Sequence, residues 1–224
     1  MLLYLLVALP GLLLGLYAQA RVKSAFNKYS KVRTSRNITG AQVARQLLNE
    51  RGLHNVGVER AQGFLSDHYD PRSKVLRLSP DVHDGTSVAA AGIAAHEMGH
   101  ALQDAKGYFP LQIRSAIVPA AQFGSSLAPW IFFAGLFLNM TGLAWAGLIL
   151  FSAAVFFTLV TLPVEFDASK RARELLLSNN VLYKDEMDGV NKVLNAAALT
   201  YVAAAIAAVG QLLYYAFLLF GRRD

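Results

Sequence analysis

The sequence predicts a mainly α-helical membrane protein that combines about four transmembrane helices with a small α+β domain containing an antiparallel sheet. Composition is the first reason: 54% of the 224 residues are hydrophobic and 16% are charged, whereas about a quarter of an ordinary soluble domain is charged. Distribution is the second reason, because residues 1–20, 115–164 and 193–220 contain no charged side chain. About 20 apolar residues are enough to cross a bilayer, so these stretches predict the membrane segments.

The composition also excludes several classes of protein. A chain this hydrophobic is not disordered, and the absence of cysteine excludes a disulfide scaffold and a cysteine protease. The net charge of +6 and the pI near 9.6 would suit a nucleic-acid-binding protein, but the positive cytoplasmic loops of a membrane protein give the same balance. We therefore expect a lipid bilayer, and no nucleic acid, among the partners.

The uncharged stretches predict individual spans. Residues 1–20 end before Arg21 and are expected to be an uncleaved anchor. The alternative is a signal peptide, since Ala18-Gln19-Ala20 resembles a cleavage site, but no basic segment precedes the apolar run. Residues 115–164 are long enough for a hairpin of two helices with a turn at residues 139–142, and residues 195–220 predict a fourth span.

The basic residues predict the orientation of the chain. Lysine and arginine number 14 in residues 21–114 and five in residues 165–194, whereas Arg222 and Arg223 are alone at the C-terminus. The positive-inside rule therefore places both polar segments in the cytoplasm and both termini outside, in a multi-pass protein of the cell membrane. Residues 21–114 then form the main cytoplasmic domain, and residues 165–194 form a cytoplasmic helical segment.

The main polar segment alternates helices and short strands. Thr39 predicts the N-cap of a helix that ends at Gly52. Three short apolar stretches, residues 56–58, 64–65 and 74–78, predict a small antiparallel sheet. The turn residues at 84–87 then predict the start of a second helix.

This second helix carries the motif His96-Glu97-Met98-Gly99-His100. Positions i and i+4 share a helix face, so both imidazoles are expected to bind one Zn²⁺ ion. Glu97 lies beside that pair, where a carboxylate can take a proton from zinc-bound water while the metal polarises a scissile carbonyl. The alternatives are a chance match on an alanine-rich helix and a zinc site without catalysis.

A catalytic zinc ion needs a third protein ligand and an open position for water. All five histidines occur by the end of the motif and there is no cysteine, so a downstream ligand must be acidic. Gln103 and Lys106 stand where the longer H-E-x-x-H-x-x-G-x-x-H motif requires glycine and histidine. Asp104 lies one further turn along the helix, about 6 Å beyond His100, which is too far from the metal.

Glu165 is the preferred third ligand because it directly follows the third predicted span and begins an amphipathic helix. The alternative for Glu165 is a simple acidic residue near a helix N-terminus, where a negative charge is favourable. Glu174 and Glu186 are the other candidate ligands.

Several separated segments resemble one known family. They are Ser66–Pro71 (SDHYDP), Leu76–Pro80 (LRLSP), Ala94–Gln103 (AAHEMGHALQ), Pro163–Ser169 (PVEFDAS) and Val193–Ala204 (VLNAAALTYVAA). In this order they resemble the YugP-type membrane zinc metallopeptidases over nearly the whole chain. The resemblance implies zinc as cofactor, His96 and His100 as ligands, Glu97 as the catalytic residue, and endopeptidase activity on proteins or peptides.

The chain is more distantly similar to the membrane peptidases of the HtpX and CAAX-prenyl protease group. This similarity implies a zincin-like α+β catalytic domain and supports Glu165 as the third ligand. That group usually has aspartate four residues after the glutamate, where this chain has Ser169, and its nearest acid is Asp167. Whether Asp167 orients a zinc-binding histidine is therefore left open. The group's later histidine, which stabilises the transition state, is absent here, so another donor must serve.

Other residues are weaker candidates. His68 and Tyr69 carry groups that can donate to an oxyanion, whereas Asp67 and Asp70 fit a turn before a proline. The strand at residues 74–78 fits either a site for an extended peptide or a covered edge. Further polar residues follow Glu165 and could also reach the site, but for each of them separately a position on a solvated helix face is the better interpretation. They are Arg171, Arg173, Asn179, Asn180 and Tyr183.

The sequence therefore predicts an integral membrane zinc metalloprotease, a hydrolase that cleaves proteins at or near the membrane surface, including membrane proteins. A rival hypothesis is an intramembrane protease, but the apolar run 88–102 around the motif is short and has Asp84 and Asp104 beside it. A second rival is a zinc-binding membrane scaffold or adaptor without proteolysis.

Overall fold

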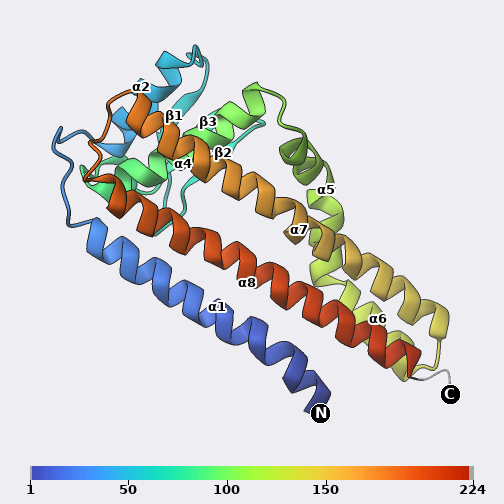
Figure 1. Cartoon of the computed structure of the whole chain (residues 1–224). Coiled ribbons are helices and arrows are strands. Elements are labelled where there is room, and N and C mark those ends of the chain that lie inside the picture. The colour runs from blue at the N-terminus through green and yellow to red at the C-terminus, as the bar shows by residue number, and fades with distance from the viewer. Residues whose placement is uncertain (1, 222–224) are drawn as a thin grey trace. The chain divides into compact units, whose positions relative to one another are not determined.

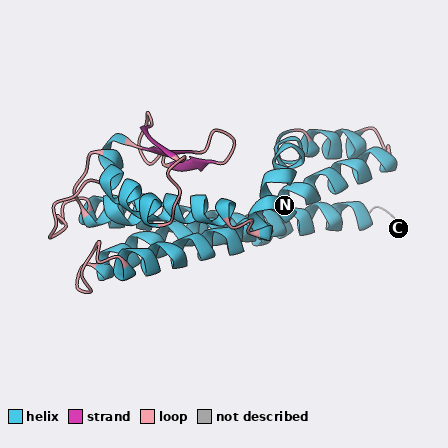
Figure 2. Cartoon of the chain, turned by 90° about the horizontal axis from the view of Figure 1, so that it is seen from above, coloured by secondary structure: helices cyan, strands magenta, loops and turns pink. Residues whose placement is uncertain are grey.

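The computed structural model describes residues 2–221, with side chains from residue 6 onward. The chain is mainly helical, as predicted, with a few short strands (Figures 1 and 2). Met1 of the first predicted span, Arg222 and Arg223 lie outside the described residues. The elements in chain order are α1 (Leu2–Tyr29), α2 (Gly40–Glu50), β1 (Gly57–Arg60), β2 (His68–Asp70), β3 (Val75–Leu78), α3 (Pro80–His83), α4 (Val88–Ala105), α5 (Phe109–Ser126), α6 (Ala128–Phe137), α7 (Thr141–Ser178) and α8 (Met187–Phe220).

The chain divides into two compact units. The first, here called the helical unit, comprises Met1–Ala18, Phe109–Pro163 and Leu199–Asp224. The second, the sheet-containing unit, comprises Gln19–Tyr108 and Val164–Ala198. The helical unit therefore holds most of the uncharged sequence, and the sheet-containing unit holds most of the charged residues and the H-E-x-x-H motif.

The sheet is mixed, with strand order β1-β3-β2. Strand β3 pairs in parallel with β1 and antiparallel with β2. The prediction of an all-antiparallel sheet was therefore wrong for β1, because the chain turns back through β2 before β3 and so leaves β1 and β3 running in the same direction. The predicted strand at residues 64–65 was also wrong: Leu65 has φ +51°, a left-handed conformation that extended strands do not contain. The second strand begins at His68 instead.

The strand preceding the motif helix is not a sheet edge. Because β3 is paired on both sides, it has no free main-chain groups along an edge for an extended peptide. The hypothesis that residues 74–78 add a substrate strand was therefore wrong, and β1 and β2 are the edges of this sheet.

The residues predicted to begin and end α2 are confirmed. Thr39 is the N-cap, with its hydroxyl accepting a hydrogen bond from Gln42 N (3.2 Å) and its own N–H donating to the Gln42 side chain (2.8 Å). This reciprocal pair is a capping box. After the helix, Gly52 takes the left-handed conformation, with φ +71°, that stops the helical path.

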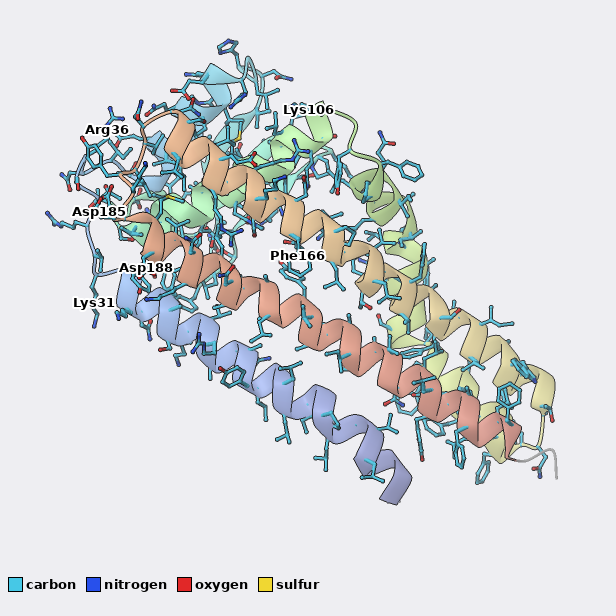
Figure 3. The ribbon with its side chains drawn as sticks, in the orientation of Figure 1. Lys31, Arg36, Lys106, Phe166, Asp185 and Asp188 are labelled. Atoms are coloured by element: carbon cyan, nitrogen blue, oxygen red, sulfur yellow. The ribbon has the colours of Figure 1, made fainter. Side chains whose placement is uncertain are left out.

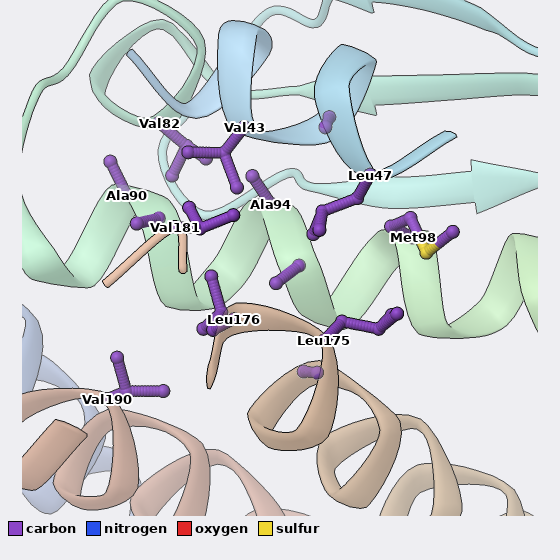
Figure 4. Close-up of a cluster of buried hydrophobic side chains, with 14 of the residues drawn as sticks. Val43, Leu47, Val82, Ala90, Ala94, Met98, Leu175, Leu176, Val181 and Val190 are labelled. Carbon is purple, nitrogen blue, oxygen red and sulfur yellow. The ribbon is translucent and has the colours of Figure 1, made fainter. Parts of the chain in front are cut away.

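The core of the sheet-containing unit is built around α4. Most of this helix is buried, as expected for a helix that is apolar on nearly all sides. Figure 4 shows side chains of α2 and α3 on one side of α4 and Leu175 and Leu176 of α7 on the other. The labelled residues come from five helices and the loop after α7: Val43, Leu47, Val82, Ala90, Ala94, Met98, Leu175, Leu176, Val181 and Val190.

Polar contacts hold the loops at one end of this unit. Glu186 accepts hydrogen bonds from Ser35 N and Tyr183 N, both at 2.7 Å. Arg36 donates to the Asn180 carbonyl oxygen, also at 2.7 Å. Figure 3 labels Arg36 and Asp185 at this end of the unit. The loop after α1 and the loop before α8 are therefore fastened to each other by side chains.

The helical unit supplies the candidate membrane spans. Among the described residues, α7 and α8 are each long and apolar enough to cross a membrane. Helices α5 and α6, bent by 41° at their junction, add a third span if the pair is taken as one. The predicted turn at residues 139–142 is confirmed, because α6 ends at Phe137, α7 begins at Thr141 and Asn139 has φ +55°. The span in α1, and with it the total of four, stays a prediction.

Small residues allow these helices to pack closely. A Cβ atom on Gly147 of α7 would lie 2.5 Å from the Phe132 nitrogen of α6, so α6 and α7 approach each other at this glycine. The Phe132 ring stacks on Tyr215 of α8, with ring centroids 4.3 Å apart. Close approach at small residues is typical of helix packing in membranes.

Candidate metal centre

Helices α4 and α7 bring together three metal-binding groups within the sheet-containing unit. His96 and His100 lie one turn apart on α4, and Glu165 lies on α7. One ligand atom from each of the three lies within 4.8 Å of the others. The Glu165 Oε2 atom is 3.2 Å from His96 Nε2 and 3.5 Å from His100 Nε2. The prediction that Glu165 approaches the motif from a distant part of the chain agrees with this geometry.

The three groups are shielded from solvent. The Glu165 side chain is 3% exposed, and those of His100 and His96 are 10% and 12% exposed. Burying a carboxylate is costly unless a positive charge compensates it. Two imidazole nitrogens facing one buried carboxylate are therefore a place where a cation, either a proton or a metal ion, is strongly favoured.

The outer ring nitrogens of both histidines are engaged by neutral side chains. His96 Nδ1 lies 3.1 Å from Ser169 Oγ, and His100 Nδ1 lies 3.0 Å from Gln103 Oε1. With Nδ1–H donating outward, Nε2 presents its lone pair to the centre of the group, as a metal ligand must. Two nitrogens and a carboxylate are a donor set that suits Zn²⁺ and leaves a fourth position open.

Gly99 allows α7 to approach the motif. A Cβ atom at this position would lie 2.7 Å from the Ala168 carbonyl oxygen of α7. Ala168 is itself fully buried. The backbones of α4 and α7 are thus in direct contact between the two histidines, which is what brings Glu165 within reach of them.

Gln103 connects the two ligand-bearing helices. Its fully buried side chain donates from Nε2 to the Val164 carbonyl oxygen and to Asp167 Oδ2, both at 2.8 Å, and its Oε1 faces His100. In the sequence, Gln103 stands out only as a mismatch to a longer motif. Its spacing of three residues from His100, which places both on one helix face, was the signal that could have identified it.

Asp167 does not contact a histidine directly. Its carboxylate accepts hydrogen bonds from Gln103 and from Arg171 Nε, and the Arg171 guanidinium lies 5.7 Å from the centre of the Tyr108 ring. Ser169, four residues after Glu165, instead occupies the position beside His96. Asp167 thus reaches His100 only through Gln103.

Glu97 is buried beside the histidines and near a second carboxyl group. Burial by itself would lower the pKa of His100, but the hydrogen bond that His100 donates to Glu165 and the charges of Glu97 and Glu165 together raise it. Burial raises the pKa of Asp67, the hydrogen bonds from Ser79 oppose this shift, and the charge of Glu97 adds to it. The negative charges of Glu97 and Glu165 thus act on His100, which favours a bound cation.

His68 and Tyr69 are engaged elsewhere. His68 is exposed on β2, and its Nδ1–H donates to the Ser66 carbonyl oxygen at 2.8 Å. The Tyr69 hydroxyl donates to Asp104 at 2.6 Å, and Lys74 binds the same carboxylate. Among the described residues, neither side chain belongs to the group formed by the histidines and Glu165.

The other candidates have structural partners. Glu174 pairs with Lys170 at 3.9 Å on the exposed side of α7, and Glu186 holds the loops described above. Arg173 donates to Asn191 at 2.8 Å and to Asn195 at 2.7 Å, so it connects α7 to α8 within the sheet-containing unit. Asn179 donates to the Leu175 carbonyl oxygen in its own helix. The structure therefore gives Glu174 and Glu186 no place in the metal-binding group of the described residues.

Comparison with known proteins agrees with this geometry. The model of a family described as "Putative neutral zinc metallopeptidase" matches residues 4–220. The chain belongs to this family. It is 47% identical over 222 residues to a protein of Bacillus subtilis (strain 168) named "Putative membrane protease YugP", covering 99% of both chains. No solved structure matches the chain. Zinc is therefore the cofactor of the family, and His96, His100 and Glu165 form the group that can bind it.

Two glycines of α4 provide a matched test of the helix contact. Gly99→Ala places a methyl group against the α7 backbone, and overpacking of this kind costs about 1–3 kcal/mol. At Gly92 the nearest atoms to an added Cβ belong to Val190, with a side-chain methyl carbon at 3.3 Å and the Cα atom at 3.7 Å, so Gly92→Ala is much less crowded. We expect Gly99→Ala to lower both the unfolding midpoint and the zinc content of detergent-purified protein, and Gly92→Ala to leave both near wild type. Equal behaviour of the two variants would contradict the assigned contact.

Proposed function

We propose that the chain is a zinc-dependent endopeptidase that hydrolyses peptide bonds of proteins at or near the membrane surface. The observation that carries this proposal is the convergence of His96, His100 and Glu165 beside the buried Glu97. Membership of a zinc metallopeptidase family supports it independently. The proposed roles are ligands for the two histidines and Glu165, and general base for Glu97.

The chemistry follows from these placements. When bound, zinc supplies a Lewis acid that polarises the scissile carbonyl and makes water a nucleophile near neutral pH. His96, His100 and Glu165 would hold the ion and, as three protein ligands, would leave a fourth position open for water. Glu97 accepts a proton from the attacking water and passes it to the amine nitrogen as the C–N bond breaks. Burial of Glu97 keeps bulk water from competing for that proton.

We further propose a multi-pass protein of the cell membrane with its catalytic site on the cytoplasmic side. The boundaries are a first span at residues 1–20, a catalytic domain at 21–114, a hairpin at 115–164, a ligand-bearing segment at 165–194 and a last span at 195–220. The distribution of lysine and arginine supports the orientation, and the apolar lengths of α7 and α8 support membrane insertion.

The position of Glu165 in the chain suggests the substrate class. It is the first charged residue after the 50 uncharged residues of the predicted hairpin. A ligand at that point places the proposed zinc site near the membrane surface. Membrane proteins with exposed loops or unfolded segments near the bilayer are therefore the proposed substrates.

Removing the general base should separate zinc binding from catalysis. We expect Glu97→Gln to keep one zinc ion per chain and to cleave casein, and the protein itself, about 10²–10⁴-fold more slowly than wild type. Detergent-purified proteins are compared for zinc content and for cleavage. If both proteins bind zinc and neither cleaves any substrate, the result favours a zinc-binding scaffold over a protease.

Removing the third ligand should act on zinc itself. Losing a residue that only hydrogen-bonds to a metal ligand lowers metal affinity roughly 10–100-fold. We expect Glu165→Gln to lower zinc affinity by more than this, because a charged ligand is lost. Glu174→Gln, on the exposed side of the same helix, is the control and should bind zinc as wild type does. Chelator competition measures both; equal affinities would exclude Glu165 as a ligand.

Zinc binding should weaken in acid. Imidazole ligands must be neutral to bind the metal, and the metal-free protein holds a proton on His100 to a higher pH than an ordinary histidine does. A raised pKa means that the proton competes with zinc at a higher pH. As the pH is lowered from 8, we therefore expect zinc affinity to begin falling before the pH reaches about 6.5. Titration of zinc binding from pH 8 to pH 5 tests this, and a flat profile would contradict it.

A further inference from the structure

The buried Gln103 side chain has a role that its position in the sequence does not reveal. We propose that Gln103 is a positioning residue that fixes the ring of His100 and holds it in register with the backbone that carries Glu165. This inference rests on the proposed zinc site. It concerns how the free protein prepares that site before zinc arrives.

The hydrogen-bond partners determine the orientation of the Gln103 amide. One end of the amide faces two groups that can only accept, the Val164 carbonyl oxygen and the Asp167 carboxylate, each at 2.8 Å. That end must therefore be the NH₂ group. The other end is then the amide oxygen, which lies 3.0 Å from His100 Nδ1.

This orientation selects one tautomer of His100. An amide oxygen only accepts, so His100 Nδ1 must carry a hydrogen atom. In the neutral ring the Nε2 lone pair is then free, and this is the atom that faces Glu165 at 3.5 Å. Gln103 thereby holds the ring in the protonation pattern and direction that a metal ligand requires.

The same side chain also holds the opposite side of the site. Val164 immediately precedes Glu165, and Asp167 follows it by two residues. Asp167 is in turn fixed by Arg171, whose guanidinium packs near the Tyr108 ring. One fully buried amide therefore joins a ligand on α4 to the chain on both sides of a ligand on α7.

Gln103 is suited to this task in a way that similar residues are not. Methionine has nearly the same length but would leave His100 Nδ1–H, the Asp167 carboxylate and the Val164 carbonyl oxygen without their shared partner. Glutamate would still accept from His100 but would place a second negative charge against Asp167. The side chains beside Nδ1 of the two histidines, Gln103 and Ser169, are both neutral. Glu165 is therefore the source of negative charge in the proposed ligand set.

The test compares metal binding in Gln103→Met and in Gln46→Met. Gln46 also donates to a carboxylate, Glu50 at 2.9 Å, but lies on α2 and does not touch the site. We expect Gln103→Met to lower zinc affinity about 10–100-fold and to alter the visible spectrum of the Co²⁺-substituted protein. We expect Gln46→Met to leave both unchanged. Wild-type affinity and spectrum in Gln103→Met would overturn the proposal.

A second pair of variants covers the case in which Gln103→Met fails to fold. Gln103→Glu alone should bind zinc more weakly than wild type, because it repels Asp167. Combining Gln103→Glu with Asp167→Asn restores a donor opposite an acceptor at position 167, while the Val164 carbonyl oxygen still faces a carboxylate. We therefore expect the double variant to recover part of the lost affinity. A double variant no better than Gln103→Glu would count against the proposal.

The outcomes distinguish this inference from the proposed function. If wild type binds zinc and cleaves casein while Gln103→Met retains full affinity, only the role of Gln103 falls. If wild type binds no zinc, the proposed function and the role of Gln103 fall together.

Discussion

The carboxylate of Glu165 is buried against two imidazole rings, and the arrangement of the sheet-containing unit depends on compensating its charge. A carboxylate with 3% exposure needs a cation close by, and His96 and His100 converge on it from one turn of α4. This requires two helices, distant in sequence, to touch. Gly99 and Ala168 permit that contact because neither carries a side chain beyond Cβ. The packing of α4 against α7 therefore also brings the three proposed metal ligands together.

The remainder of the sheet-containing unit packs around α4 and fixes its position. On one side the helix packs against α2 and α3, and on the other against the end of α7. No described buried side-chain nitrogen or oxygen lacks a hydrogen-bond partner, so the polar network around the site is fully satisfied. Such a network is rigid, and rigid ligands lose little entropy when a metal binds.

Much of this was predictable from the sequence, and the reasons are local. The spacing of His96 and His100, the capping of α2 by Thr39 and the turn at Asn139 each depend on a few neighbouring residues. Glu165 was reached by eliminating other ligand types. Pairing of β1 with β3 and the contacts of Gln103 and Ser169 depend on which distant segments meet, and no local pattern encodes that. The same holds for Tyr69, because no local pattern indicated that its hydroxyl is bound to Asp104.

X-ray absorption spectroscopy at the zinc edge of the detergent-purified protein would identify the atoms that bind the metal. We expect one zinc ion per chain in a shell of nitrogen and oxygen atoms at about 2.0–2.2 Å, with the outer-shell scattering of two imidazole rings and no sulfur. Replacing Glu165 by glutamine should remove an oxygen atom of the protein from this shell or empty the site. Absence of zinc, or a shell without histidine scattering, would contradict the assignment of His96, His100 and Glu165 as its ligands.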